Sequence, residues 1–400
     1  MANHCYKLNQ NFRDTTYFDT VSHQKWASSF LLGVAFHQTG NTNLWQMFEV
    51  ESMQLLRLLE VQHISGYAGL DATEVQLRKK AFWLMFYGYM HQMHNLRNER
   101  LTFLDPVISC EINLEDLMPA AVDDEYISSS GILPCPESIT AQSLTSGFNI
   151  HSRIFSAALR PPGSDLEKHC ICSHMKDPVA RLGSLRERLH HLKYMLDTVL
   201  PAYRPWNKST IAVHSTTSTE QEDVANIQRE AIRANIHATH LWLQSMLLDQ
   251  IDTLVGQQTQ ESTSPPGNYS SPTPGTWGSV SWDEREDLCR QLLHLLHSIS
   301  QSVLEPNGLS LVSTPCERKS KPDTLTFSFL NKLQVYKARD VAISLLSCPY
   351  DLAEGRTRRA TEYLREFSSL LCMLDPSEQV NLPSLQSWID ISRDKHIISL

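Results

Sequence analysis

The chain has 400 residues, of which 41% are hydrophobic and 20% charged, and its formal net charge is −9. This composition excludes a disordered chain, and the acidic balance argues against a duplex DNA-binding surface, which is basic. Nine scattered cysteines do not make a disulfide framework. The first residues hold no secretory signal, and no apolar run is long enough to cross a membrane. We therefore expect a protein of a reducing compartment, the cytosol or nucleus.

Apolar residues recur at helical spacing along the chain, and the alternation typical of strands is rare. The sequence therefore predicts an all-α fold, an irregular multi-helix array with disordered loops. The first strongly marked helix follows Asp71 and Thr73, two candidate N-caps, and has Glu74 in its first turn. From Ala81 to Met90 it is apolar on most faces, which predicts a helix buried on all sides.

Four aromatic side chains of this helix are candidates for lining either the core or an effector pocket: Phe82, Trp83, Phe86 and Tyr89. At any one position, core packing is the default interpretation for a residue of this kind. Further along, Pro106 and Pro119 break the helical period.

Three later segments each carry one apolar stripe of helical spacing. The first has Arg186, Arg188 and Lys193 on its opposite, solvated face. The stripes comprise Leu185, Leu189, Leu192, Leu196 and Val199; then Ile227, Ala231, Ala234, Ala238, Leu241, Ser245 and Leu248; then Leu288, Leu292, Leu295, Ile299 and Val303.

Polar segments separate these helices. In 257–280, twenty of 24 residues are Gln, Ser, Thr, Pro, Gly or Asn. Such a segment buries too little apolar surface to offset its ordering entropy, so we predict a disordered linker there. Two further polar gaps are expected, at about 128–143 and 209–222.

The 17 histidines include candidate metal ligands. Three pairs at i, i+3 place both imidazoles on one helix face, but none has a third ligand at a fitting spacing. A cluster at 169–174, His-Cys-Ile-Cys-Ser-His, lacks the usual zinc-finger spacing. A helical metalloenzyme using the histidine pairs stays open as a rival interpretation. The pairs are His91/His94, His237/His240 and His294/His297.

The sequence contains no nucleophile elbow, no phosphate-binding Gly-rich loop and no metalloprotease motif. We accordingly expect no enzyme, no catalytic, cofactor-binding or metal-ligating residue, and no cofactor.

Residues 75–127 resemble the middle homology region of fungal transcription factors, whose usual partner is an N-terminal zinc binuclear cluster. The resemblance rests on Arg78-Lys79-Lys80-Ala81-Phe82-Trp83, the aromatic run after it, and Leu114-Glu115-Asp116-Leu117-Met118-Pro119. Upstream, segments 28–33 and 45–59 resemble the two helices that precede this region in the family. Downstream, segments 189–206, 233–245 and 304–308 resemble the quinic acid utilisation activator subgroup.

The resemblance implies a regulatory domain over 15–256, the 257–280 linker, and a helical region over 281–400 with an insertion at 313–335. The helix after that insertion is expected to start near Tyr336. The implied function is that of a nuclear, pathway-specific transcriptional regulator controlling a metabolic or secondary-metabolite gene cluster. Expected partners are other transcription factors or co-regulators, a small-molecule effector and a second copy of the chain.

These residues lack the zinc cluster itself, because Cys5 is the sole cysteine before Cys110 and a cluster needs about six within thirty residues. Direct DNA binding by these residues is therefore not expected. Two explanations stay open: the cluster belongs to an unread upstream part of the gene, or the regulator acts through partners. The alternative function is a helical interaction scaffold that modulates another transcription factor.

Overall fold

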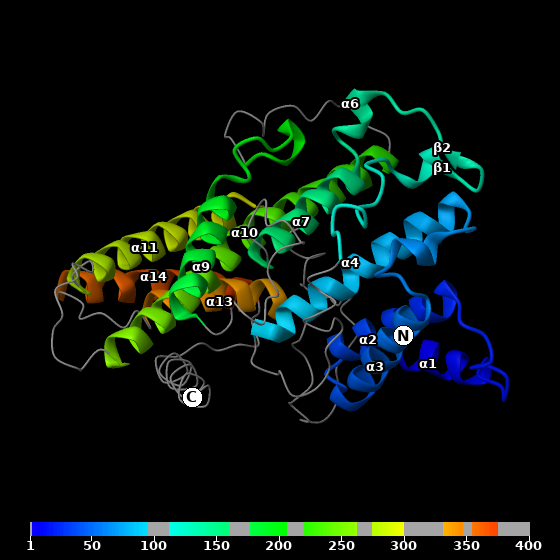
Figure 1. Cartoon of the computed structure of the whole chain (residues 1–400), viewed down its shortest axis with the longest axis horizontal. Coiled ribbons are helices and arrows are strands. Elements are labelled where there is room, and N and C mark those ends of the chain that lie inside the picture. Colours follow the sequence, from blue (N-terminus) through cyan, green and yellow to red (C-terminus); the bar gives the residue numbers. More distant parts are fainter. Residues whose placement is uncertain are drawn as a thin grey trace. The chain divides into compact units, whose positions relative to one another are not determined.

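The protein is all-α, as the sequence predicts, in a computed structural model that is drawn in Figure 1. Among the residues described, the β-structure is one antiparallel hairpin whose two strands have two residues each. The chain divides between Ser152 and Arg153 into two compact units, and the helices from Leu333 onward belong to the second. The structure describes residues 2–94, 112–159, 177–205, 220–261, 274–299, 331–346 and 354–374.

The first unit begins with three helices, α1 (Ala2–Asn11), α2 (His23–Gln38) and α3 (Thr42–Leu58). Ser22 and Asn41 cap the second and third by accepting hydrogen bonds from backbone amides of the first turn. The rings of Phe36 and Phe48 stack at 5.9 Å, and Tyr6 meets both edge-on. This aromatic cluster joins α1 to the α2–α3 pair.

A 3-10 turn, η1 (Ile64–Tyr67), leads to α4 (Ala72–His94). Asp71 caps α4 as predicted, because its Oδ1 accepts a 3.0 Å hydrogen bond from the Glu74 amide. The prediction that this helix is buried on all sides is wrong. Leu84 and Gly88 are exposed, so α4 keeps one face in solvent although that face carries apolar residues.

The polar segment after Pro119 is ordered rather than a featureless gap. It forms a 3-10 turn, the β1–β2 hairpin and a short helix before α7 begins at Leu144. One face of α7 buries small polar side chains, among them Asn149 and Ser152. The elements are η2 (Asp124–Tyr126), β1 (Ile127–Ser128), β2 (Gly131–Ile132), α6 (Glu137–Thr140) and α7 (Leu144–Leu159).

The second unit is organised around α10 (Glu220–Glu261), a helix of 42 residues. From Ile236 to Leu248 every residue of α10 is buried. Helix α9 (Pro178–Tyr194) lies along it through the predicted stripe of Leu185, Leu189 and Leu192, and η3 (Pro201–Tyr203) packs beside it. The helical stretch buried on all sides is therefore 236–248 of α10, not the aromatic run of α4.

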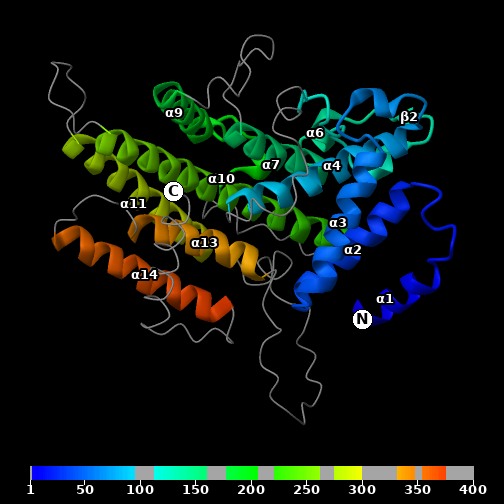
Figure 2. The same ribbon diagram turned by 60° about the horizontal axis from the view of Figure 1, so that its bottom comes forward.

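Three more helices belong to the second unit: α11 and α13 pack on α10, and α14 packs on α11 (Figures 1 and 2). Cys289 of α11 donates to a backbone carbonyl of α13, and Arg356 and Arg359 of α14 pair with carboxylates of α11. The helices are α11 (Pro274–Ser298), α13 (Asn331–Leu346) and α14 (Glu354–Leu374).

This division differs from the predicted domain boundaries at 15–256 and 281–400. After the linker, α11 and α13 pack on α10 and α14 packs on α11, so these helices fall in the second unit. Helix also occupies both ends of the predicted 257–280 linker, and its middle, 262–273, lies outside the described residues. The predicted 313–335 insertion lies outside them too, except that α13 already begins at Asn331.

Among the helices of the described ranges, none is long and apolar enough to cross a membrane.

Candidate functional site

Three of the four aromatic candidates of α4 lie in the core. Phe82, Trp83 and Phe86 are fully buried, and the centroids of their rings lie 5.2–5.9 Å apart. Tyr89 is half-buried, with its ring 6.3 Å from that of Phe86. Of the two predicted roles, these contacts fit core packing.

The segment that ends the sequence motif is fastened to α4 and α7 by side chains. The indole Nε1 of Trp83 donates to the Leu117 carbonyl oxygen at 3.0 Å, and Lys79 Nζ donates to that of Met118 at 3.2 Å. Asn149 Nδ2 donates to the Pro119 carbonyl at 2.8 Å. The backbone amide of Ala120 donates to Gln76 Oε1 at 2.7 Å. We call residues 117–120 and these four side chains the motif lock.

Each of the three basic residues of α4 makes contacts within the first unit. Arg78 pairs with Glu74 at 2.7 Å and donates to the Leu59 carbonyl, Lys79 belongs to the motif lock, and Lys80 pairs with Asp124 at 2.7 Å. Consecutive cations on one helix turn therefore hold α3, the irregular segment and η2. Their contacts account for the run without a nucleic-acid partner.

The buried histidine pair of α10 is committed to backbone carbonyls. His237 Nε2 lies 2.9 Å from the Tyr203 oxygen, and His240 Nε2 lies 2.6 Å from that of Leu192. A carbonyl only accepts, so each Nε2 carries the proton. Within the described ranges, no three His, Cys, Asp or Glu side chains are placed to hold a metal ion.

The other predicted metal candidates differ in position. His294 and His297 are exposed, and His297 pairs with Glu366 at 3.1 Å. His91 is half-buried on α4. The side chain of His94 and the 169–174 cluster lie outside the described residues.

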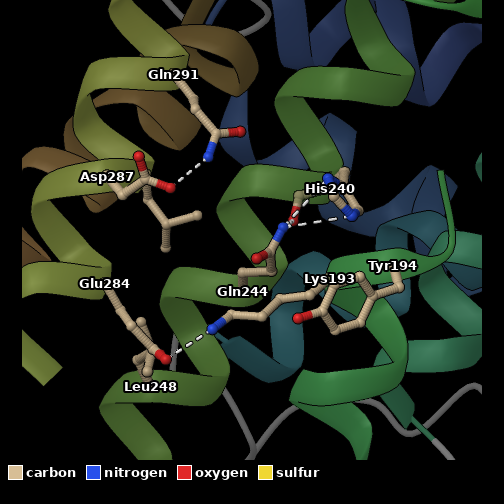
Figure 3. A pocket seen from close by; sticks show the side chains of 9 residues that line it. Lys193, Tyr194, His240, Gln244, Leu248, Glu284, Asp287 and Gln291 are labelled. Atoms are coloured by element: carbon tan, nitrogen blue, oxygen red, sulfur yellow. Dashed lines mark hydrogen bonds and ion pairs between the residues drawn. The ribbon is translucent and has the colours of Figure 1, made fainter. Parts of the chain in front are cut away.

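A cavity of about 270 Å³ opens between α9, α10 and α11 in the second unit (Figure 3). An ion pair crosses it, with Lys193 Nζ 2.7 Å from Glu284 Oε1. The remaining lining is mostly polar. It comprises Tyr194, His240, Gln244, Leu248, Asp287, Leu288 and Gln291.

His240 and Gln244 form one wall of this cavity, one helical turn apart on α10. Gln244 Nε2 lies 3.2 Å from His240 Nδ1 and 3.3 Å from His240 Nε2, so the amide nitrogen contacts the imidazole ring. Burial lowers the pKa of His240 to about 4, against an opposing effect of its hydrogen bond to Leu192. The imidazole is therefore neutral at pH 7, and it fixes the orientation of the Gln244 amide.

Next to the cavity, Arg285 forms a buried ionic cluster. Its Nη2 lies 2.7 Å from Asp252 Oδ2, and its Nη1 pairs with Asp249 and contacts Ser344. Ser281 donates to the same Asp252 oxygen at 2.9 Å. This cluster ties α10, α11 and α13 together through charge-assisted hydrogen bonds.

Lys337 is a second buried cation, 2% exposed, between α13 and α10. Its Nζ donates to Thr239 Oγ1 at 2.8 Å and lies 5.9 Å from the centroid of the Trp242 ring. Burial lowers the pKa of Lys337 to about 7, since its ammonium is removed from water.

The cavity residues were not predicted from the sequence. Lys193 was assigned to a solvated face, and that prediction is incomplete, because its ammonium pairs with a glutamate 91 positions away. Arg188 of the same face also has partners in the protein, because its guanidinium donates to the carbonyls of Ala158 and Leu159 at the end of α7. One sequence pattern could have indicated the site: the polar residues His237, His240 and Gln244 interrupt the apolar sequence of α10.

Comparisons with protein-family models, with curated proteins and with solved structures each find no match for the chain.

Proposed function

We propose that the chain is the regulatory region of a fungal pathway-specific transcription factor of the zinc binuclear cluster class. It would act in the nucleus on a metabolic or secondary-metabolite gene cluster, and it would reach DNA through a separate cluster or a partner protein. The proposal starts from the resemblance of residues 75–127 to the middle homology region.

One observation carries this proposal furthest: the residues that make the resemblance are joined in space. The Trp-bearing helix and the Leu-Glu-Asp-Leu-Met-Pro segment meet in the motif lock, where Trp83 and Gln76 bind residues 117–120. A chance similarity in two separate stretches gives no reason for their side chains to bind each other. Shared hydrogen bonds between the two halves are expected if they were selected as one module.

The acidic charge supports a role for partners in DNA recognition. At −9, the chain lacks the general basic surface that binds phosphates, and Arg78, Lys79 and Lys80 are engaged within the first unit. The purified chain should show no sequence-selective DNA binding at physiological salt.

A reporter assay tests the function. The full chain is fused to a heterologous DNA-binding domain in a fungal host whose reporter gene carries that domain's sites. We expect reporter output to differ from that of the DNA-binding domain alone. If the fusion and the DNA-binding domain alone gave equal reporter output on every carbon and nitrogen source, the proposal would be contradicted.

The second candidate is a helical scaffold that modulates another transcription factor. The exposed apolar side chains Met47, Val50 and Leu58 favour it, because their spacing places them on one face of α3. A scaffold would leave the tethered reporter unchanged and would alter the DNA-bound fraction of a separate factor in a gel shift.

A further inference from the structure

The charges at the cavity between α9, α10 and α11 restrict what it can bind. Glu284 pairs with Lys193, and Asp287 pairs with Arg290 of its own helix, so the charges at the lining balance. A purely anionic or a purely cationic ligand would leave one charge of this set without an opposite one. A ligand that carries both charges suits this lining best, because each of its charges finds an opposite one.

Glu284 has an unused acceptor. Its Oε1 binds Lys193, while its Oε2 is buried and has no hydrogen-bond partner in the part of the chain that the structure describes. A buried carboxylate oxygen without a donor costs free energy. This oxygen has almost no accessible surface, so a ligand ammonium supplies it with donors once the Glu284 side chain leaves Lys193 and turns toward the cavity.

The rest of the lining offers neutral hydrogen-bonding groups around a small apolar surface. The amide nitrogen of Gln244 is held by His240, which leaves its oxygen as an acceptor (Figure 3). Leu248 and Leu288 provide the apolar surface. A cavity of about 270 Å³ suits a ligand of small-metabolite size.

We propose that this cavity binds a free α-amino acid in its zwitterionic form. The ligand carboxylate accepts hydrogen bonds from Lys193 Nζ, and the ligand ammonium donates to Glu284. The protein ion pair is exchanged for two protein–ligand ion pairs, so no charge is left unpaired. The inference rests on the proposed function, in which this amino acid is the effector.

Calorimetric titration of the full chain tests the ligand class with three matched probes. L-Norvaline carries both charges, valerate lacks the amino group, and butylamine lacks the carboxylate. We expect norvaline to bind about tenfold or more tightly than either, since each lost contact is a charge-assisted hydrogen bond. Equal binding of valerate or butylamine, or no binding by norvaline, would overturn the proposal.

Variants then place the ligand at the ion pair. Lys193→Met and Glu284→Gln should each weaken norvaline binding by about tenfold or more. Glu286→Gln is the matched control, because Glu286 lies on the same helix, pairs with Arg359 at 2.9 Å and does not line the cavity. Norvaline affinity unchanged in the first two variants would overturn the assignment.

The double variant Lys193→Glu with Glu284→Lys restores the ion pair with its charges exchanged. It should therefore bind norvaline again, whereas a variant that had lost binding through misfolding would not. Failure to rescue binding in a double variant that unfolds at the wild-type temperature would count against the two-point contact. The reporter assay is read separately. Reporter control without norvaline binding would overturn the ligand class alone, and binding without reporter control would overturn the regulatory function alone.

Discussion

The indole nitrogen of Trp83 donates a 3.0 Å hydrogen bond to the carbonyl oxygen of Leu117, 34 residues further along the chain. The contact is fully buried, and it joins the aromatic helix to the irregular segment that ends the motif. The indole therefore does two things: it fills the core of the first unit, and it satisfies a backbone carbonyl that has left regular structure.

Trp83→Ala should destabilise the first unit by about 3–5 kcal/mol, because it leaves a large cavity beside Phe82 and Phe86. Trp83→Phe keeps most of the packing and loses the hydrogen bond, which leaves the Leu117 carbonyl unpaired, so its cost should be about 1–3 kcal/mol. Urea denaturation followed by circular dichroism measures both.

Phe12→Ala serves as the control for these two variants. Phe12 is 78% exposed, so its truncation should change the free energy of unfolding by less than about 0.5 kcal/mol. A cost for Trp83→Ala no greater than this control would show that the indole is peripheral to the fold.

Arg285→Met should cost about 3–5 kcal/mol, since Asp249 and Asp252 would lose their buried counter-charge. Adding Asp249→Asn and Asp252→Asn should recover much of that loss, because no unpaired charge then remains. Arg290→Met is the control, as Arg290 is mostly exposed on the same helix. A triple variant as unstable as the single one would contradict the ionic account.

Lys337→Met should stabilise the second unit at neutral pH. Burial lowers the pKa of Lys337 from 10.5 to about 7, so the unfolded chain binds the proton more tightly. The resulting penalty is full below pH 7 and disappears as pH rises through 7 to 10.5. The variant's advantage, roughly a few kcal/mol at most, should shrink over that window.

This gain is measured as the difference in unfolding free energy between Lys337→Met and wild type at pH 6, 8 and 10. Lys7→Met, at an exposed lysine of α1, should show no such trend. A pH-independent difference for Lys337→Met would mean that the buried amine does not titrate in this range.

His240 should make the protein sensitive to acid. Burial lowers its pKa from 6.5 to about 4, so the folded state resists a proton that the unfolded chain accepts. The free energy of unfolding that depends on a neutral His240 is fully present above pH 6.5 and is lost as the pH falls toward 4.

His240→Gln should therefore flatten the fall of unfolding free energy between pH 6.5 and 4, while His294→Gln at an exposed site of α11 should not. His237, whose pKa burial also lowers, accounts for part of the remaining slope. Identical slopes in His240→Gln and wild type would exclude His240 as a source of this acid sensitivity.

The sequence predicted the parts of the fold that depend on local pattern. The start of α4 at Asp71, the burial of Trp83 and the leucine stripe of α9 all follow from capping and helical spacing. The prediction was wrong about Leu84, since an apolar run does not say which of its faces meets another element.

The sequence could not predict the candidate site, because its contacts join distant positions. Lys193 meets Glu284 only after α9 and α11 have packed on either side of α10. The buried polar side chains of α10, such as Thr239 and His240, gain their partners from α13 and α9. Without those partners, a helix with polar residues inside its apolar stretch is expected to keep a solvated face.

The measurement that tests the central claim most directly is reporter output from the tethered chain, compared between wild type and Asn149→Leu. Asn149 holds the Pro119 carbonyl in the motif lock. Wild type should change output relative to the DNA-binding domain alone, and Asn149→Leu should lose that effect at equal protein level. Wild-type output equal to that of the DNA-binding domain alone in every growth medium would contradict the account.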